Sequence, residues 1–153
     1  MSDLLQLHEA IAAAMKTLQS LVALDAQLGK TADLIDQCLR AGNKLLVCGN
    51  GGSAADASHF ATEFVVRFTK DRRALPAICL GSDSGILTAA GNDYGFDEIF
   101  ARQVAAFGVR GDVLICLTTS GKSKNLIRAL EEAKARQLKT IAFLGRDGGS
   151  TVG

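Results

Sequence analysis

The feature that most constrains the fold is a set of four short apolar runs separated by stretches with a helical hydrophobic period. The runs cover residues 44–48, 77–80, 112–117 and 140–144, and the helical patterns cover about 54–68, 96–107 and 124–136. Short runs that are apolar on both faces are typical of strands buried inside a parallel sheet. Strands alternating with helices predict a three-layer α/β fold with helices on both faces of a parallel sheet.

A heptad stripe precedes this region. Its apolar members are interrupted only at Asp25, and they predict one long helix over residues 4–28. A second, shorter helix is predicted over 31–40, ended by Gly42. The stripe needs an apolar partner, and the pattern alone allows either the chain's own domain or a second subunit. The members of the stripe are Leu4, Leu7, Ile11, Ala14, Leu18, Leu21 and Leu28.

Length and charge exclude several classes of protein. The 153 residues suit a single domain. Seventeen basic against sixteen acidic residues leave a net charge of +1, far too little for a nucleic-acid partner. Four scattered cysteines without a C-x-x-C motif indicate a reducing compartment. No apolar run approaches the ~18 residues that span a bilayer, so we expect a soluble, cytoplasmic protein without a membrane partner.

Two loops that follow predicted strands carry the residues suited to a ligand. The first is C-G-N-G-G-S at 48–53, and the second is T-T-S-G-K-S at 118–123. Glycines let the backbone approach a ligand, and a following helix offers free N–H groups and a positive dipole end. Hydroxyls at such a helix start suit a phosphate, although an isolated serine there is more often only an N-cap. Because several hydroxyls follow one another in the second loop, the sequence favours a phosphate-binding site there over a simple N-cap.

Two familiar phosphate-binding motifs do not account for these loops. Gly121-Lys122-Ser123 matches the end of a Walker A loop, but Cys116 occupies the position of its first glycine. Gly49, Gly51 and Ala54 satisfy a dinucleotide fingerprint, yet Asp83 comes too late to be its acidic residue.

Two further constellations are candidates for chemistry. His59 and Glu63 are four residues apart on one predicted helix and therefore share a face. Such a pair is usually a surface contact, but it can also bind zinc or transfer protons. The stretch G-N-D-Y-G at 91–95 is predicted to be a loop, and its Asn92 and Asp93 could hydrogen-bond sugar hydroxyls.

Taken in order, the motifs C-G-N-G-G-S, H-F-A-T-E, G-N-D-Y-G-F-D, T-T-S-G-K-S and G-R-D-G-G resemble the sugar isomerase (SIS) domain family, most closely its phosphoheptose isomerases. The resemblance implies a flavodoxin-like sheet of five parallel strands and a homotetramer with active sites between subunits. Residues 1–41 would serve oligomerisation, and 42–153 would form the sheet and the phosphosugar-binding core. It implies interconversion of sedoheptulose 7-phosphate and D-glycero-D-manno-heptose 7-phosphate through an enediol, for bacterial lipopolysaccharide precursors.

The resemblance also assigns roles to residues. Glu63 would be a catalytic acid/base, and His59 and Glu63 would be zinc ligands. Thr118 stands where the family usually has serine, and Lys122 where it usually has asparagine; both changes keep or strengthen anion binding. Substrate contacts would come from Asn50, Gly51, Gly52, Ser53, Glu63, Asn92, Asp93, Thr118, Thr119, Ser120 and Ser123.

Members of the family continue with another strand and a final helix, which carry a glutamine and a histidine of the metal and acid/base site. We therefore expect residues 1–153 alone to be a poor catalyst. One alternative is a non-catalytic SIS-domain protein associated with the bacterial replication initiator. Another is a sugar-phosphate sensor of the kind fused to DNA-binding domains. The carboxylate of Glu63 and the intact G-N-G-G-S loop favour the isomerase over the replication-associated protein.

Overall fold

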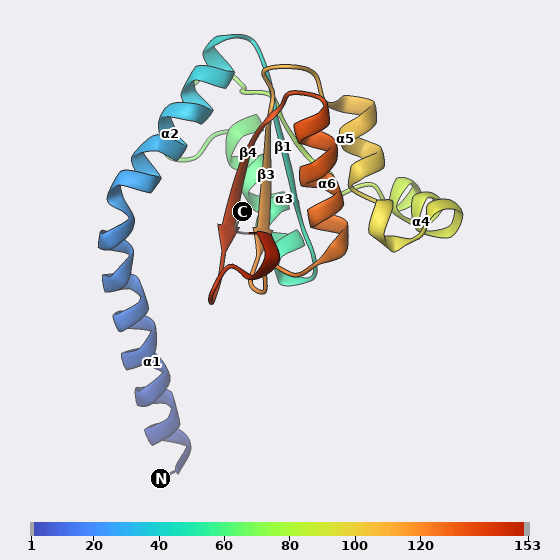
Figure 1. The fold of residues 1–153 in the computed structure, drawn as a ribbon. Coiled ribbons are helices and arrows are strands. Elements are labelled where there is room, and N and C mark those ends of the chain that lie inside the picture. The colour runs from blue at the N-terminus through green and yellow to red at the C-terminus, as the bar shows by residue number, and fades with distance from the viewer. Residues whose placement is uncertain (1, 152–153) are drawn as a thin grey trace. The chain divides into compact units, whose positions relative to one another are not determined.

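The computed structural model describes residues 2–151, which divide into two compact units within 1–34 and 35–153. The first unit contains helix α1 (Ser2–Ser20), the 3-10 turn η1 (Leu21–Leu24) and the start of helix α2 (Asp25–Arg40) (Figure 1). The predicted long N-terminal helix is therefore confirmed, and the 3-10 turn at Leu21–Leu24 divides it. The second helix begins at Asp25 rather than at residue 31, because an acidic side chain in the first turn is favoured by the helix dipole.

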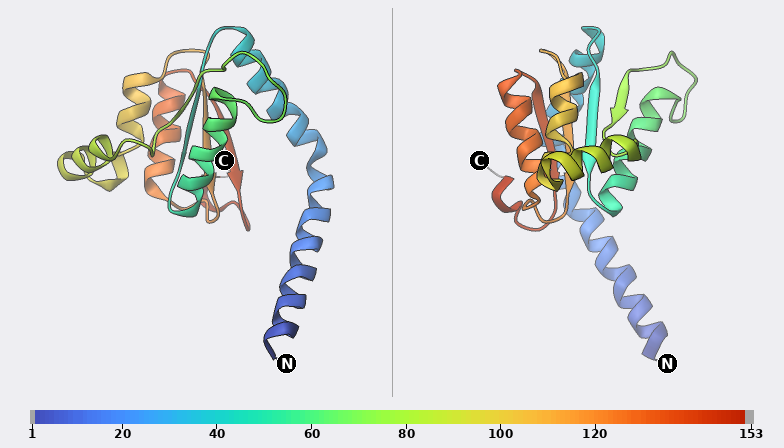
Figure 2. Two further views of the ribbon diagram at one scale, coloured as in Figure 1. Left: turned by 180° about the vertical axis from the view of Figure 1, so that it is seen from behind. Right: turned by 90° about the vertical axis from the view of Figure 1, so that its right-hand side faces the viewer.

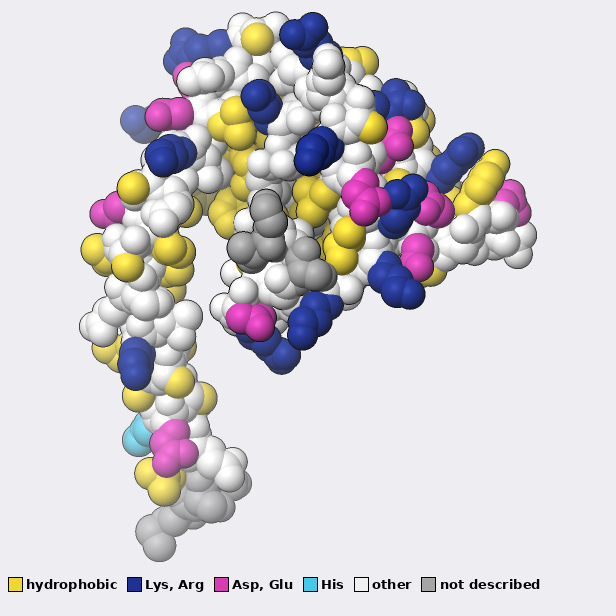
Figure 3. All heavy atoms as spheres, viewed as in Figure 1, with side chains coloured by type: hydrophobic (Ala, Val, Ile, Leu, Met, Phe, Trp, Pro, Cys, Tyr) yellow, Lys and Arg dark blue, Asp and Glu magenta, His cyan; other side chains and the backbone are white. Residues whose placement is uncertain are grey.

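The apolar stripe of the first unit is exposed. Figure 3 shows hydrophobic side chains along the helix, and the larger members of the stripe are between 43% and 66% exposed. These side chains are Leu4, Leu7, Ile11, Leu18, Leu21 and Leu28.

The second unit is built on a parallel sheet. Its strands are β1 (Leu45–Gly49), β2 (Ala77–Cys79), β3 (Val113–Thr118) and β4 (Lys139–Leu144), in the order β2-β1-β3-β4. All four predicted runs are strands, so the predicted fold class is confirmed, and the order is that of flavodoxin-like sheets. The fifth strand implied by the resemblance is not among residues 2–151.

Helices cover both faces of the sheet. Helix α3 (Gly52–Val65) lies on one face, and α5 (Ala101–Phe107) and α6 (Lys124–Ala135) lie on the other (Figure 2). Alternate residues of each central strand point to opposite faces. Leu46, Cys48, Leu114 and Cys116 accordingly pack into one cluster with side chains of α5 and α6, including Val104, Leu126 and Ala129.

The prediction of a loop over 91–95 is wrong. Helix α4 (Ser84–Tyr94) includes Asn92 and Asp93 in its last turn. The helix forms because the Asp83 carboxylate caps it by accepting a hydrogen bond from the Ile86 N–H at 2.9 Å. It ends at Gly95, whose φ of +88° suits glycine. The 3-10 turn η2 (Phe96–Glu98) then precedes α5, and η3 (Gly149–Thr151) follows β4.

Candidate functional site

A small polar cavity lies at the carboxyl ends of β1 and β3, where the two ligand loops meet. Its volume is about 190 Å³. The strand order reverses between β1 and β3, and in open α/β sheets ligands bind at such a switch point. We call this cavity the hydroxyl pocket; its lining residues are Asn50, Ser53, Leu117, Thr118, Thr119, Ser120, Ser123 and Leu126.

The loop after β1 requires glycine where it turns tightly. A Cβ on Gly49 would lie 2.5 Å from the Ser53 carbonyl oxygen, closer than real contacts, and Gly51 has a φ of +56°. Helix α3 begins at Gly52 with Gly51 as its N-cap. Ser53 therefore lies in the first turn rather than at the N-cap, and its hydroxyl lines the pocket.

The hydroxyls of the second loop are oriented by backbone amides. The Thr118 Oγ1 atom accepts a hydrogen bond from the Gly121 N–H at 3.2 Å, and the Ser120 Oγ atom accepts one from the Lys122 N–H at 3.3 Å. Ser123 is the N-cap of α6, but its side chain makes no capping hydrogen bond. A hydroxyl that accepts with one lone pair can still donate its hydrogen. Each of these hydroxyls therefore still has a hydrogen that it can donate.

Asn125, which the sequence patterns do not single out, joins the two loops. Its amide exchanges two hydrogen bonds with the Asn50 amide, Nδ2 to Oδ1 in each direction, both at 2.9 Å. Asn125 is only 2% exposed. Its buried side chain therefore holds the Asn50 side chain in place through these two hydrogen bonds. A lone asparagine in the first turn of a helix carries no periodic signal that could have revealed this partner.

The cavity suits a phosphate group. The N-termini of α3 and α6 both border it, and each adds free N–H groups and a positive dipole end. Its lining offers hydroxyls and amides but no ionised side chain. A compact anion can therefore be bound there by uncharged donors.

Two buried cysteines lie on the strands that lead to the pocket. The Sγ atoms of Cys48 and Cys116 lie 3.5 Å apart on paired strands, and both side chains are fully buried. The hydrogen bond to Cys116, together with burial, raises the pKa of the Cys48 thiol well above its usual range. A neutral thiol does not attack a sugar carbon.

His59 and Glu63 form a pair on α3 outside the hydroxyl pocket. The His59 Nε2 and Glu63 Oε1 atoms lie 2.9 Å apart, and the side chains are 75% and 31% exposed. Glu63 follows Ser53 by ten residues of helix, or roughly 15 Å along the axis. The structure therefore places the candidate acid/base on the same helix as Ser53, but not in the hydroxyl pocket.

Asn92 and Asp93 lie in a third place. The Asn92 amide donates to the Asp93 carboxylate at 2.8 Å. Asp93 lines a separate cavity of about 300 Å³ beside Tyr94 and Arg102, whose guanidinium lies 4.2 Å from the tyrosine ring centre. Neither residue lines the hydroxyl pocket.

A zinc site needs more ligands than the pair His59 and Glu63 provides. Among residues 2–151, no group of three or more His, Cys, Asp or Glu side chains is arranged to hold a metal ion. His59 and Glu63 supply two donors, whereas a protein zinc site usually has three or four. The pair by itself is therefore an incomplete site.

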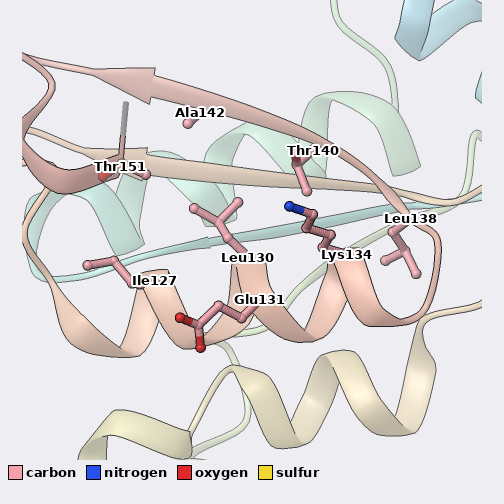
Figure 4. A pocket seen from close by; sticks show the side chains of 8 residues that line it. All are labelled: Ile127, Leu130, Glu131, Lys134, Leu138, Thr140, Ala142 and Thr151. Atoms are coloured by element: carbon pink, nitrogen blue, oxygen red, sulfur yellow. The ribbon is translucent and has the colours of Figure 1, made fainter. Parts of the chain in front are cut away.

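A larger cavity of about 550 Å³ lies between α6 and β4 (Figure 4). Ile127, Leu130 and Leu138 give it an aliphatic wall, and Glu131 and Lys134 stand at its α6 side. It has two threonines but lacks the dense hydroxyl and amide set of the smaller pocket, so it is not suited to a phosphate.

The fold and the hydroxyl pocket define an open α/β protein with a polar cavity at its switch point. The comparison with family models names the class further: the SIS domain model matches residues 8–145. The chain belongs to the SIS domain family. Within the described residues no helix is long and apolar enough to cross a membrane.

Similar proteins are phosphoheptose isomerases. The chain is 56% identical over 127 residues to the phosphoheptose isomerase of Geobacter sp. strain M21, covering 83% of this chain and 66% of that protein. It is 58% identical over 113 residues to the phosphoheptose isomerase of a Nitratiruptor species, covering 74% of this chain and 60% of the relative. The aligned part thus spans less than two thirds of these relatives.

Solved structures agree with the fold. The structure of phosphoheptose isomerase from Neisseria gonorrhoeae has a TM-score of 0.90 at 43% identity, covering 95% of this chain and 77% of the other. A phosphoheptose isomerase structure from Francisella tularensis has a TM-score of 0.94 at 39% identity, covering 99% and 80%.

Proposed function

We propose that this protein is a phosphosugar isomerase that interconverts sedoheptulose 7-phosphate and D-glycero-D-manno-heptose 7-phosphate. The observation that carries the proposal is the hydroxyl pocket between β1 and β3, found in a chain 56% identical to a phosphoheptose isomerase. We further place the reaction in the cytoplasm, in the supply of heptose precursors for lipopolysaccharide. The matches named above give no support to the replication-associated alternative.

In this proposal the hydroxyl pocket binds the phosphate group, and the carbon chain of the sugar extends out of the pocket and reacts there. Thr118, Ser120 and Ser123 donate to the phosphate oxygens, and the Gly51–Gly52 backbone contacts the substrate beside Asn50. Glu63 removes a proton next to the carbonyl to give an enediol, and a proton returned to the neighbouring carbon gives the isomer. Binding energy from the phosphate positions the reacting carbons.

The site is completed, we propose, by a second copy of the chain. Glu63, Asn92 and Asp93 lie outside the hydroxyl pocket of their own subunit, so a shared substrate needs residues from two subunits. The exposed stripe of the first unit supplies the contact, because apolar side chains 43% to 66% exposed gain free energy when a second copy covers them. We propose a homotetramer, as the family resemblance implies.

Zinc enters the proposal only as an ion that His59 and Glu63 could help to hold. A bound zinc would polarise an oxygen of the substrate, and the proton transfer above does not pass through it. Metal analysis of the purified protein and of His59→Ala checks this part. Loss of metal in the variant supports the assignment, and an equal metal content contradicts it.

The experiment that tests the isomerase is turnover of sedoheptulose 7-phosphate by a parent protein that includes the family's final strand and helix, and by its Glu63→Gln variant. The longer protein is used because residues 1–153 alone are expected to be a poor catalyst. The amide keeps the size of the side chain but cannot accept the proton, so kcat should fall by at least ~10², while phosphate binding stays unchanged. Zinc content is measured on the same samples, since the substitution also changes a proposed ligand. Parent-like turnover by Glu63→Gln contradicts its assignment as the acid/base.

The parent itself gives the test of the reaction. If the longer parent protein binds the substrate but shows no turnover, with and without added zinc, it is a phosphosugar-binding protein and the isomerase proposal is contradicted.

A further inference from the structure

A second polar cavity opens beside the hydroxyl pocket. It has a volume of about 220 Å³ and is lined by Ser120, Lys122, Arg146 and Asp147. Ser120 lines both cavities, so a ligand bound in one lies next to the other. Figure 3 shows Lys and Arg side chains beside an acidic side chain at the lower end of the second unit, over the loops that Figure 1 places below β3 and β4.

Close backbone packing between two loops builds this cavity. Gly121 lies so near the loop after β4 that a Cβ on it would fall 1.8 Å from the Gly148 carbonyl oxygen. The Thr151 hydroxyl also donates to the Gly121 carbonyl at 2.6 Å. Lys122 follows Gly121 directly and Arg146 is two residues before Gly148, so this packing holds two cations around one space.

The charges of the cavity favour an anion. Within residues 2–151, neither Lys122 nor Arg146 is paired with a carboxylate, whereas Arg40, Arg128 and Arg136 each form ion pairs. The Asp147 carboxylate accepts a hydrogen bond from the Gly149 N–H at 3.2 Å. Two cations against one carboxylate leave a positive potential, while the adjoining hydroxyl pocket has no ionised side chain in its lining.

We propose that Lys122 and Arg146 form a second anion subsite, which binds the second phosphate of a ligand whose first phosphate occupies the hydroxyl pocket. This inference rests on the proposed phosphate site, because Ser120 is common to both cavities. A planar guanidinium and an ammonium are the side chains best suited to phosphate oxygens. The ligand class is a small molecule with two phosphate groups, either a sugar bisphosphate or directly linked phosphates, and it competes with monophosphates.

Titration calorimetry with four probes tests the subsite. The probes are inorganic phosphate, pyrophosphate, fructose 6-phosphate and fructose 1,6-bisphosphate. Charge-assisted hydrogen bonds to the second phosphate should make the parent protein bind a two-phosphate probe about tenfold more tightly than its one-phosphate counterpart. Preference for the bisphosphate assigns the subsite to phosphates separated by a sugar, and preference for pyrophosphate alone assigns it to linked phosphates.

Charge-matched variants separate the subsite from general attraction. In Lys122→Asn with Arg146→Gln, the preference for the second phosphate should disappear. Lys139→Asn with Arg110→Gln removes the same charge from exposed cations near the other ends of β4 and β3, and it should keep the preference. Equal binding of one- and two-phosphate probes by the parent overturns the inference, as does a preference that survives in the first double variant.

The outcomes also distinguish this inference from the proposed function. A parent protein that binds fructose 6-phosphate without preferring the bisphosphate keeps its phosphate site and loses only the second subsite. A parent protein that binds none of the four probes loses the phosphate site, and the proposed function fails with it.

Discussion

At the scale of single residues, the hydroxyl pocket depends on which hydrogen bonds its oxygens already make. Ser120 and Thr118 accept from loop amides, which leaves their hydrogens to be donated outward. The same amides hold the side chains in place before any ligand arrives. Such preorganisation lowers the entropy cost of binding.

Ser120→Asp should weaken phosphate binding by more than about tenfold, or about 1.4 kcal/mol, because it places a carboxylate where the phosphate is expected. Thr69→Asp adds a similar charge to an exposed loop outside the pocket and is the control. Calorimetry with inorganic phosphate measures both. Equal phosphate affinities of the two variants would show that the phosphate does not bind at Ser120.

Asn125→Leu should lower both the stability of the protein and its affinity for phosphate. Leucine has a similar size but removes both hydrogen bonds to Asn50, and a part-buried amide left unpaired costs about 1–3 kcal/mol. Urea unfolding gives the stability, and calorimetry gives the affinity. If stability falls while affinity is unchanged, Asn125 supports the core without positioning Asn50.

Much of the pocket could be predicted from the sequence, since hydroxyls and glycines directly after two apolar runs must meet at one edge of a parallel sheet. Asn125 could not be predicted in this way. Its role comes from a contact with Asn50, which is 75 positions away in the sequence. A local sequence pattern cannot predict a contact between residues so far apart. The placing of Glu63 outside the cavity likewise depends on how far α3 runs beyond its first turn.

At the scale of elements, the loop between β1 and α3 sets the sharpest steric limit. Gly49→Ala should destabilise the protein by at least about 1–3 kcal/mol, because its Cβ would lie 2.5 Å from the Ser53 carbonyl oxygen. Gly52→Ala is the matched control, since a Cβ there meets nothing within 4 Å. Thermal unfolding compares the two variants, and equal melting temperatures would contradict the close approach of Gly49 to Ser53.

Helix α4 shows why an element can be missed. The sequence G-N-D-Y-G at 91–95 has the composition of a turn, and its glycines favour that interpretation. The deciding signal lies at the other end, where Asp83 caps the helix. Strands are easier to predict, because apolar runs buried on both faces leave little choice of structure.

At the scale of the whole molecule, the exposed stripe of the first unit should decide the oligomeric state. Leu18→Glu places a charge on the stripe, where the parent side chain is 66% exposed, and should shift the assembly to smaller species. Ala13→Glu adds the same charge away from the stripe on the same helix and should leave the assembly intact. Sedimentation at micromolar concentration measures both.

A parent protein that sediments as a monomer at micromolar concentration would contradict the proposed homo-oligomer outright. Identical sedimentation of a larger parent and of both variants would instead place the contact on another surface.

The strand order also has a consequence for how the protein is made. Strand β1 is synthesised first, yet its partner β3 begins 64 residues after β1 ends, at Val113, and Asn50 must wait for Asn125. Contacts so distant in sequence form slowly, because the chain between them must first be ordered. During synthesis the apolar residues of β1 are therefore exposed well before the sheet can close, and the nascent chain is most prone to aggregation in that interval.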